Sequence, residues 1–458
     1  MTQETIFARL NTLLERNQMN KMHGALLMLN VVDIAEFMEE LEANRLLKFF
    51  RILPKDIAAD VFAYLDSEKQ QELIELISDG EINDLIDDMY LDDTVDFLEE
   101  LPAVVVHRIL QNTNAEKREL INRFLKYPAN SAGSIMTIEY AELQENSTVA
   151  QAIETLRKTG LDKETIYTCY VIGTGRQLLG FVELRHLILA KPDEIMTNIM
   201  NSNVISVKTT DDRETVADLV RKYDLLSLPV TDNEGRLVGI VTVDDIIDVL
   251  DAENTEDMEL MRGLLPSDDE YMKTPVATLF AKRIPWLLIL MVSATFTGMI
   301  ITHFSDVLST TGRLGVLLTA CLPMLMDTGG NCGSQSSTLV IRSMALGQIG
   351  FTDFFQVWWR EVRVAFLVGL TLCVANVARQ LLLYTFTDGV TIDTVTVTFV
   401  VSFAMFLTVI IAKSLGCILP LFAKKIKLDP AIMAGPIITT IVDACALTIL
   451  FTIATKFM

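Results

Sequence analysis

The sequence predicts a multidomain protein with four parts: an α-helical, superhelical N-terminal domain, an α/β pair of repeated units, a connecting helix, and an α-helical membrane domain of five spans. A chain of 458 residues is too long for a single hydrophobic core. Half of its residues are hydrophobic, although its net charge is −22. The two properties separate along the chain, because residues 1–270 hold 52 acidic and 25 basic residues, whereas residues 271–458 hold 8 and 13.

The acidic first half restricts the possible partners. Nucleic-acid binding requires a basic surface that replaces counterions, so we expect no nucleic-acid partner. An acidic surface attracts cations instead. Residues 1–20 are polar and amphipathic and lack the apolar run of a signal peptide, so we expect the first half to stay in the cytosol. The six cysteines include no CxxC pair, and we interpret them as small buried hydrophobic residues.

Residues 1–130 are predicted to form the acidic N-domain. Apolar residues recur there at three- and four-residue spacing, and helices are expected to begin near Pro54 and Pro102. The repeated short helices indicate a helical superhelix. Six acidic residues fall within thirteen positions, and they form either a solvated helical face or part of a divalent-ion site: Asp84, Asp87, Asp88, Asp92, Asp93 and Asp96.

Residues 131–255 contain an internal repeat, which we divide into units 131–197 and 198–255. The segment from Ser134 resembles the segment from Asn198, and the end CYVIGTGRQLLGFVELRHLIL resembles LPVTDNEGRLVGIVTVDDIIDVL. Gly175 and Gly235 are expected in hairpin turns. The repeat resembles a tandem pair of CBS domains, many of which bind adenine nucleotides. His186 and Leu225 do not favour a nucleotide site, because related modules often carry Asp and a stacking aromatic residue there. ATP therefore remains an alternative ligand.

The second unit continues into a run of seven acidic residues within fourteen positions, followed by the predicted connecting helix, residues 256–280. Like charges on one helical face destabilise a helix unless cations neutralise them. Mg²⁺ suits such a site because it takes oxygen ligands and keeps several waters. A solubilising helix end is the alternative. The candidate metal ligands of the soluble half are Asp92, Asp93, Asp212, Glu214, Asp244, Asp245, Asp248, Glu253, Glu256 and Asp257.

Residues 281–458 are predicted to form a membrane domain of five spans, near residues 286–304, 314–341, 364–386, 394–422 and 431–454. Each run is long enough to cross about 30 Å of hydrocarbon. Basic residues concentrate in three segments that must lie on one side, which predicts a cytosolic N-terminus and an extracytoplasmic C-terminus in the cell membrane. These basic residues are Lys282, Arg283, Arg342, Arg360, Arg363, Lys424, Lys425 and Lys427.

Polar groups within the predicted spans indicate a function at membrane depth. Asp443 lies halfway along the last span, with Thr439 one turn before it, and a carboxylate there normally faces water or a partner. The second span contains PMLMDTGGNCGSQS, where Pro323 and the glycines are expected to disrupt or loosen the helix. The candidate pore-lining residues are Asp327, Gly329, Gly330, Asn331, Gln335 and Thr439.

Two basic residues also fall within the spans. Lys413 is expected to pair with Asp443 or Asp327, or to extend towards the cytosol, and the sequence does not choose between these alternatives. Arg379 is expected to extend to the outer surface.

These features together resemble the MgtE family of magnesium channels over almost the whole chain. The matching segments are the acidic helical domain, the repeated pair ending VGIVTVDDIIDVL, PMLMDTGGNCGSQS, and LDPAIMAGPIITTIVDA. The resemblance implies a homodimer in a lipid bilayer with a pore at the dimer axis. It assigns Asp443 to the pore, where two copies would hold a largely hydrated Mg²⁺. Gly435 stands where some relatives carry a polar residue, so part of the pore lining is expected to differ.

The resemblance also implies regulation by the transported ion. When cytosolic Mg²⁺ is high, ions bridge acidic residues of the N-domain, the CBS pair and the connecting helix, and the channel closes. Asp429, at the start of the last span, is expected to tie the pore to the helix below it. The excess of acidic residues supports this scheme independently, because compaction of such a surface requires cations.

The sequence leaves two alternative functions of the same class open: a transporter of other divalent cations such as Co²⁺, Ni²⁺ or Mn²⁺, and a transporter gated by a nucleotide. A CBS-bearing anion channel is disfavoured by a carboxylate in the path. A membrane-anchored sensor without transport is the third class. We expect no enzyme, because the sequence shows no nucleophile–base arrangement, phosphate-binding glycine loop or zinc-ligand cluster.

Overall fold

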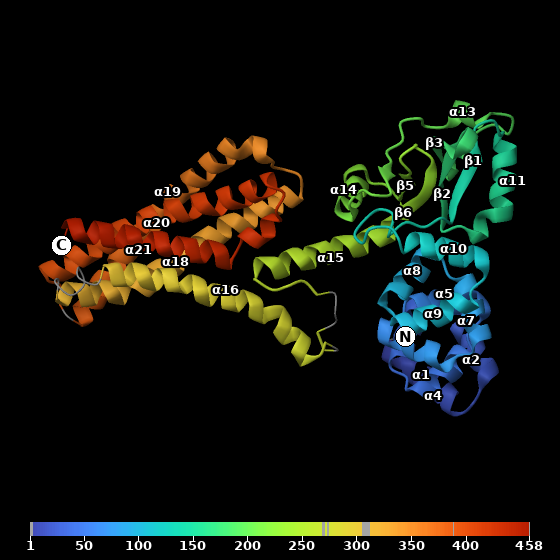
Figure 1. The fold of residues 1–458 in the computed structure, drawn as a ribbon, viewed down its shortest axis with the longest axis horizontal. Coiled ribbons are helices and arrows are strands. Elements are labelled where there is room, and N and C mark those ends of the chain that lie inside the picture. Colours follow the sequence, from blue (N-terminus) through green and yellow to red (C-terminus); the bar gives the residue numbers. More distant parts are fainter. Residues whose placement is uncertain (1–2, 268–270, 273, 305–311, 388, 458) are drawn as a thin grey trace. The chain divides into compact units, whose positions relative to one another are not determined.

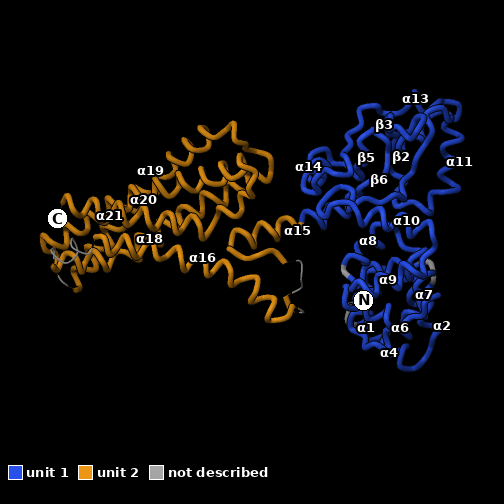
Figure 2. The backbone as a smooth tube through the Cα atoms, viewed as in Figure 1, with its two compact units in different colours: residues 1–250 blue, residues 251–458 orange. Residues whose placement is uncertain are grey.

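The computed structural model describes residues 3–267, 271–272, 274–304, 312–387 and 389–457 (Figure 1). The chain divides into two compact units, residues 1–250 and residues 251–458 (Figure 2).

In its described residues the N-domain is a stack of ten helices, in which α1 packs on α2 and the helices from α3 to α10 pack on the next but one. Helix α3 contacts α5, α5 contacts α7 and α7 contacts α9, while α4, α6, α8 and α10 follow one another in the same way. This alternation confirms the predicted superhelix. Pro54 and Pro102 precede α5 and α9, as expected. The helices are α1 Gln3–Glu15, α2 Met19–Leu26, α3 Val31–Glu39, α4 Ala43–Phe50, α5 Lys55–Ala63, α6 Ser67–Leu76, α7 Asp79–Asp88, α8 Leu91–Glu100, α9 Ala103–Asn112 and α10 Ala115–Phe124.

The internal repeat forms two sheets of the same topology. In each sheet the first strand pairs in parallel with the second, and the second pairs antiparallel with the third. The first repeat contains β1 Tyr140–Gln144, α11 Val149–Thr159, η1 Gly160–Asp162, β2 Thr165–Ile172, η2 Thr174–Arg176, β3 Leu178–Glu183, α12 Leu184–Leu189 and α13 Met196–Ile199. The second repeat contains β4 Val207–Lys208, α14 Arg213–Tyr223, β5 Ser227–Thr231 and β6 Leu237–Thr242.

Two pairs of equivalent glycines explain why the repeat is visible in the sequence. Gly175 and Gly235 have φ angles of 71° and 78°, and they lie in the two hairpin turns as predicted. Gly180 pairs with Val171 and Gly239 with Val230. A Cβ atom at Gly180 would lie 2.6 Å from the carbonyl oxygen of Asn201, and one at Gly239 would lie 2.9 Å from that of Thr137. Each glycine therefore lets a linker segment cross the third strand closely.

The connecting helix α15 spans Val243–Met261 and starts directly after β6. It begins earlier than the predicted range of 256–280, of which residues 268–270 and 273 lie outside the described part of the chain. Gly263 follows α15 with a φ of 71°. A Cβ atom there would overlap the indole ring of Trp286, so glycine is required where this turn packs on the first membrane helix.

In its described residues, the compact unit 251–458 contains five long helices where five spans were expected: α16 Val276–His303, α18 Arg313–Ala345, α19 Phe354–Phe386, α20 Ile392–Lys425 and α21 Pro436–Phe457. The short helices η3 Phe351–Asp353 and η4 Pro430–Met433 precede α19 and α21. Among the described residues, four helices are long and apolar enough to cross a membrane, namely all but α18. Helix α18 is 33 residues long, and polar residues occupy its middle.

Helix α20 lies at the centre of the membrane domain, where it packs against α18, α19 and α21. Pro323 and the glycines were expected to disrupt or loosen the helix, but α18 is continuous from Arg313 to Ala345, so the expected disruption is wrong. The prediction failed because the glycines are buried against neighbouring helices, whose packing holds the backbone helical.

Candidate functional site

A stripe of polar side chains runs along one face of α18. Asp327, Asn331 and Gln335 are exposed in the single chain. They are four residues apart, so they lie one above another on the same helical face. In hydrocarbon an exposed amide or carboxylate is costly and normally faces a water-filled path or a protein partner. The stripe is therefore a candidate wall of a polar path.

Asp443 on α21 lies close to this stripe. Its side chain is half-buried, and Asp327 is the charged group that acts on it electrostatically. The sequence motifs of the second and fifth predicted spans are thus brought together, with one carboxylate from each helix. Two neighbouring carboxylates in a low-dielectric surrounding repel each other and favour a cation between or beside them.

Thr439 lies one turn before Asp443, at the contact between α18 and α21. Its hydroxyl group donates a hydrogen bond to the Pro436 carbonyl oxygen at 2.9 Å. A Cβ atom at Gly330 would lie 3.1 Å from its methyl group. Gly435 has a φ of 51°, and a Cβ atom there would overlap the Met261 carbonyl oxygen. Glycine at position 435 therefore permits the end of α15 to approach the start of α21.

Gly329 and Gly330 are buried in the helix seam and do not lie on the exposed stripe. A Cβ atom at Gly329 would lie 2.8 Å from the Thr408 side chain on α20 and 2.9 Å from that of Val442 on α21. These glycines bring three helices together, which differs from the pore-lining role that the sequence suggested.

Lys413 pairs with neither Asp443 nor Asp327, so those two alternatives are wrong. Its ammonium group lies 3.9 Å from the carboxylate of Glu361 on α19 and donates a hydrogen bond of 3.1 Å to Ser336 on α18. Glu361 was missed by sequence reasoning because it stands in the basic segment before the third predicted span. Arg379 is exposed and donates a hydrogen bond to Asn376 at 3.0 Å.

In the first unit, acidic residues gather where α8 and α15 begin. Burial and the charge of neighbouring carboxylates raise the pKa of Asp92 well above its usual range. The same causes raise the pKa of Asp93 to about 6, that of Asp245 to about 6 and that of Glu164 to about 7. Asp244 contributes to the field at Asp93 and Glu164. The structure therefore brings four predicted acids together with Glu164, which no sequence pattern marked.

Other predicted ligands of the first unit have identifiable local roles. Asp212 caps α14 by accepting a hydrogen bond from the backbone nitrogen of Glu214 at 3.0 Å, and both side chains are exposed. The Asp245 carboxylate accepts a hydrogen bond of 2.5 Å from the Thr242 hydroxyl. Burial raises the pKa of the Tyr64 hydroxyl, and the charge of Asp248 adds to the effect together with those of other carboxylates.

A second acidic group lies in the second unit, between the end of α15 and the start of η4. Burial and the charge of Asp429 raise the pKa of Asp257 to about 6, and Glu253 and Glu256 add to the effect. Arg342 acts in the opposite direction and donates a hydrogen bond of 3.2 Å to Asn254. Asp429 also accepts a hydrogen bond from the Ala431 backbone at 2.7 Å. Asp429 therefore lies within electrostatic range of the end of α15, where its charge repels that of Asp257, and the tie between the pore and this helix stays a prediction.

Within the described residues, no three Asp, Glu, His or Cys side chains converge closely enough to hold a metal ion directly. The acidic groups lie within electrostatic range without forming a ready coordination shell. An ion that keeps much of its water fits this arrangement better than one that needs several direct protein ligands.

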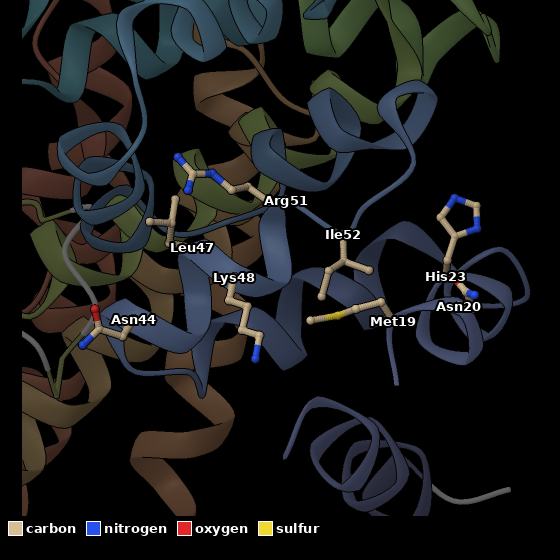
Figure 3. Close-up of a pocket in the computed structure, with 8 residues that line it drawn as sticks. All are labelled: Met19, Asn20, His23, Asn44, Leu47, Lys48, Arg51 and Ile52. Atoms are coloured by element: carbon tan, nitrogen blue, oxygen red, sulfur yellow. The ribbon is translucent and has the colours of Figure 1, made fainter. Parts of the chain in front are cut away.

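The N-domain also has a surface pocket, which is lined by residues between Met19 and Ile52 (Figure 3). Its lining includes three basic side chains, of which Arg51 forms an ion pair with Glu81 at 2.8 Å. We assign it no function. The lining residues are Met19, Asn20, His23, Asn44, Leu47, Lys48, Arg51 and Ile52.

Comparison with known proteins gives matches along the whole chain. The pattern of the family MgtE, described as a divalent cation transporter, matches residues 322–453. Patterns of the MgtE intracellular N domain and of the CBS domain match residues 29–130 and 196–252. The magnesium transporter MgtE of Thermus thermophilus is 34% identical over 92% of both chains. That of Bacillus subtilis is 31% identical over 100% of this chain and 98% of its own.

Two solved structures resemble the first half. The soluble part of a magnesium transporter is 34% identical, with a TM-score of 0.53, and the match covers 55% of this chain and 99% of the other. The cytosolic domain of the Mg²⁺ channel MgtE in complex with ATP is 34% identical, with a TM-score of 0.51 and coverage of 53% and 99%.

Proposed function

We propose that this chain, which belongs to the MgtE family of divalent cation transporters, conducts Mg²⁺ into the cell. We propose further that it closes when its acidic cytosolic residues bind Mg²⁺. Like its relatives, it is a transporter and not an enzyme. The observation that supports the ion path is the electrostatic interaction of Asp443 on α21 with Asp327, the first residue of the polar stripe on α18.

The path is completed by a second copy of the chain. The stripe on α18 is exposed in the single chain, and exposed polar groups in hydrocarbon require a partner. A homodimer that placed two copies of Asp443 and of the stripe around a common axis would supply four carboxylates and several amide groups. Mg²⁺ dehydrates reluctantly, so such a path would hold it largely hydrated.

The regulation rests on acidic groups that repel each other without a cation. Asp92, Asp93, Asp245 and Glu164 link α8, α15 and the β2 region of the first unit. Asp257 and Asp429 link α15 to the start of η4 in the second. High cytosolic Mg²⁺ would neutralise both groups and hold the connecting helix in place. Low Mg²⁺ would leave repulsion that releases it.

The orientation is proposed from the basic loops. The chain spans the cell membrane with the N-terminus in the cytosol and the C-terminus outside, because Lys282, Arg342 and Lys424 belong to segments on the same side.

Ion flux into proteoliposomes that hold the full chain tests the transport function. We expect Mg²⁺ uptake down its gradient, measured with an enclosed Mg²⁺ dye, and no chloride flux. Parallel measurements with Co²⁺, Ni²⁺ and Mn²⁺ determine whether other divalent cations pass. A purified, folded protein that moves none of these ions would contradict the proposal and favour a sensor without transport.

Acidity should substitute for Mg²⁺ in the first unit. Raised pKa values mean that the folded state binds protons more tightly than the unfolded state, so stability falls as pH rises from about 4 to about 7. We expect a lower unfolding temperature of this unit at about pH 8 than at about pH 5, and MgCl₂ should reverse the loss at the higher pH. Calorimetry of the full chain in detergent measures both. Stability that rose over this pH range would contradict the interpretation.

ATP is a second candidate ligand, because a solved relative carries it in its cytosolic domain. In this chain Leu225 is partly buried against the core of the first unit, whereas His186 is exposed. Neither residue provides a ring that stacks on adenine from a buried position. Titration of the full chain with ATP would measure whether it binds.

A further inference from the structure

Three polar side chains from three helices meet inside the membrane domain, near the end of the spans that we place at the cytosol. The Ser336 hydroxyl on α18 donates to the Glu361 carboxylate on α19 at 2.5 Å and accepts from the Lys413 ammonium on α20 at 3.1 Å. The exposed fractions of the Lys413 and Glu361 side chains are 5% and 14%, and Ser336 is fully buried. We call these three residues the ion lock.

We do not expect the ion lock to add much to the folding stability of the membrane domain. Each charge at membrane depth is costly to bury, and a buried ion pair often contributes no more than apolar residues of similar size. A Met and a Leu would fill the same space without that cost. A hydrogen-bonded ion pair instead provides directional contacts. Its hydrogen bonds form only when the three helices have a particular rotation about their axes and a particular position along them.

The neighbouring contact between α18 and α20, which we call the seam, restricts the distance between the two helices. A Cβ atom at Gly416 would overlap the Gly333 carbonyl oxygen and would lie 3.0 Å from the Cβ atom of Ser336. The seam therefore fixes how closely the two helices approach. Small residues alone permit sliding and rotation along such a seam, whereas the ion lock within it does not.

Ser336 follows Gln335 directly, and Gln335 belongs to the exposed polar stripe. Successive residues differ by about 100° around a helix, so fixing Ser336 towards α19 and α20 fixes the direction of Gln335 and of Asn331 one turn earlier. We propose that Ser336, Glu361 and Lys413 are positioning residues that set the rotation of α18, and thereby the ion selectivity of the polar stripe. This inference rests on the proposed transport function.

Two adjacent serines provide a matched test. Ser336 and Ser337 are both fully buried on α18, but among the described residues the Ser337 hydroxyl has no hydrogen-bond partner. The measurement is the ratio of Mg²⁺ to Co²⁺ uptake by the full chain in proteoliposomes. We expect Ser336→Ala to lower this ratio about tenfold, which corresponds to about 1.4 kcal/mol of differential ion binding. We expect Ser337→Ala to leave it unchanged.

A charge exchange separates positioning from general stability. In Lys413→Glu combined with Glu361→Lys, the Ser336 hydroxyl can still donate to a carboxylate and accept from an ammonium group. We expect this double variant to recover the wild-type ratio, whereas Lys413→Glu alone does not. The unfolding temperature in detergent is recorded for every variant.

The outcomes distinguish the two proposals. Equal ratios for Ser336→Ala and Ser337→Ala would overturn the ion lock as a positioning device. If Ser336→Ala did not fold, the charge exchange would decide, since a folded double variant with an altered ratio would also overturn it. A wild-type protein without Mg²⁺ uptake would overturn the proposed function, and the ratio of the divalent ions that it does carry would then test the lock.

Discussion

Replacing Asp443 with alanine should abolish Mg²⁺ uptake by the full chain. The substitution removes the only acidic side chain of α21 and, in a dimer, two charges from the path at once. A cation in a narrow path at membrane depth depends on such charges to replace part of its hydration. We expect flux at the level of empty liposomes, because loss of even about 4 kcal/mol of ion stabilisation lowers a rate about a thousandfold.

The control for Asp443→Ala lies five residues further along the same helix. Thr448 is exposed, and its hydroxyl group bonds to the Ala444 carbonyl oxygen of its own helix at 2.8 Å. Thr448→Ala should therefore conduct like the wild type. Asp443→Glu keeps the charge and should retain part of the flux. Undiminished uptake by a folded Asp443→Ala protein would show that the ions take another path.

The second large effect is expected when Asp93 and Asp245 are both changed to asparagine. Burial and neighbouring carboxylates raise the pKa values of both side chains to about 6, so their negative charges are disfavoured in the folded state at neutral pH, each by about 3 kcal/mol. Removing both charges should make the first unit compact without Mg²⁺. We expect protease to cut the variant in Mg²⁺-free buffer more slowly than the wild type, and added Mg²⁺ to change the rate little.

The matched control uses exposed acids of the same unit that are not candidate ligands. Glu116 and Asp193 are both exposed. Glu116→Gln with Asp193→Asn should leave the Mg²⁺ dependence of proteolysis intact, with Ca²⁺ as the ionic control in all samples. If Asp93→Asn with Asp245→Asn responded to Mg²⁺ as the wild type does, the regulatory ions would have to bind elsewhere.

Features with a periodic or local cause were predictable from the sequence. The helical stack followed from apolar spacing, and Pro54 and Pro102 marked two helix starts because proline fits there. The repeat was visible because Gly175 and Gly235 need positive φ angles, and Gly180 and Gly239 need room for a crossing segment. The Asp443 carboxylate was predicted to be functional because a charged group within a membrane span is costly unless it faces water or a partner.

Features that depend on contacts between distant segments were not predictable. Glu361 and Lys413 are 52 positions apart in the sequence, and no spacing rule joins them. Glu164 joins the acidic group only because β2 starts beside α8 and α15. The glycines of α18 were expected to loosen their helix, whereas tight packing on α20 and α21 keeps it regular. Tertiary packing overrides a weak local preference in each case.

The central claim is that one ion both passes through the membrane domain and closes it from the cytosolic side. The most direct measurement is Mg²⁺ uptake by proteoliposomes as Mg²⁺ is raised on the side that carries residues 1–250, with Asp443→Ala as the reference for zero flux. We predict uptake that is high when that side is free of Mg²⁺ and falls as Mg²⁺ is added there, more than the smaller gradient explains. Uptake that followed the gradient alone, or that matched the Asp443→Ala reference throughout, would contradict the account.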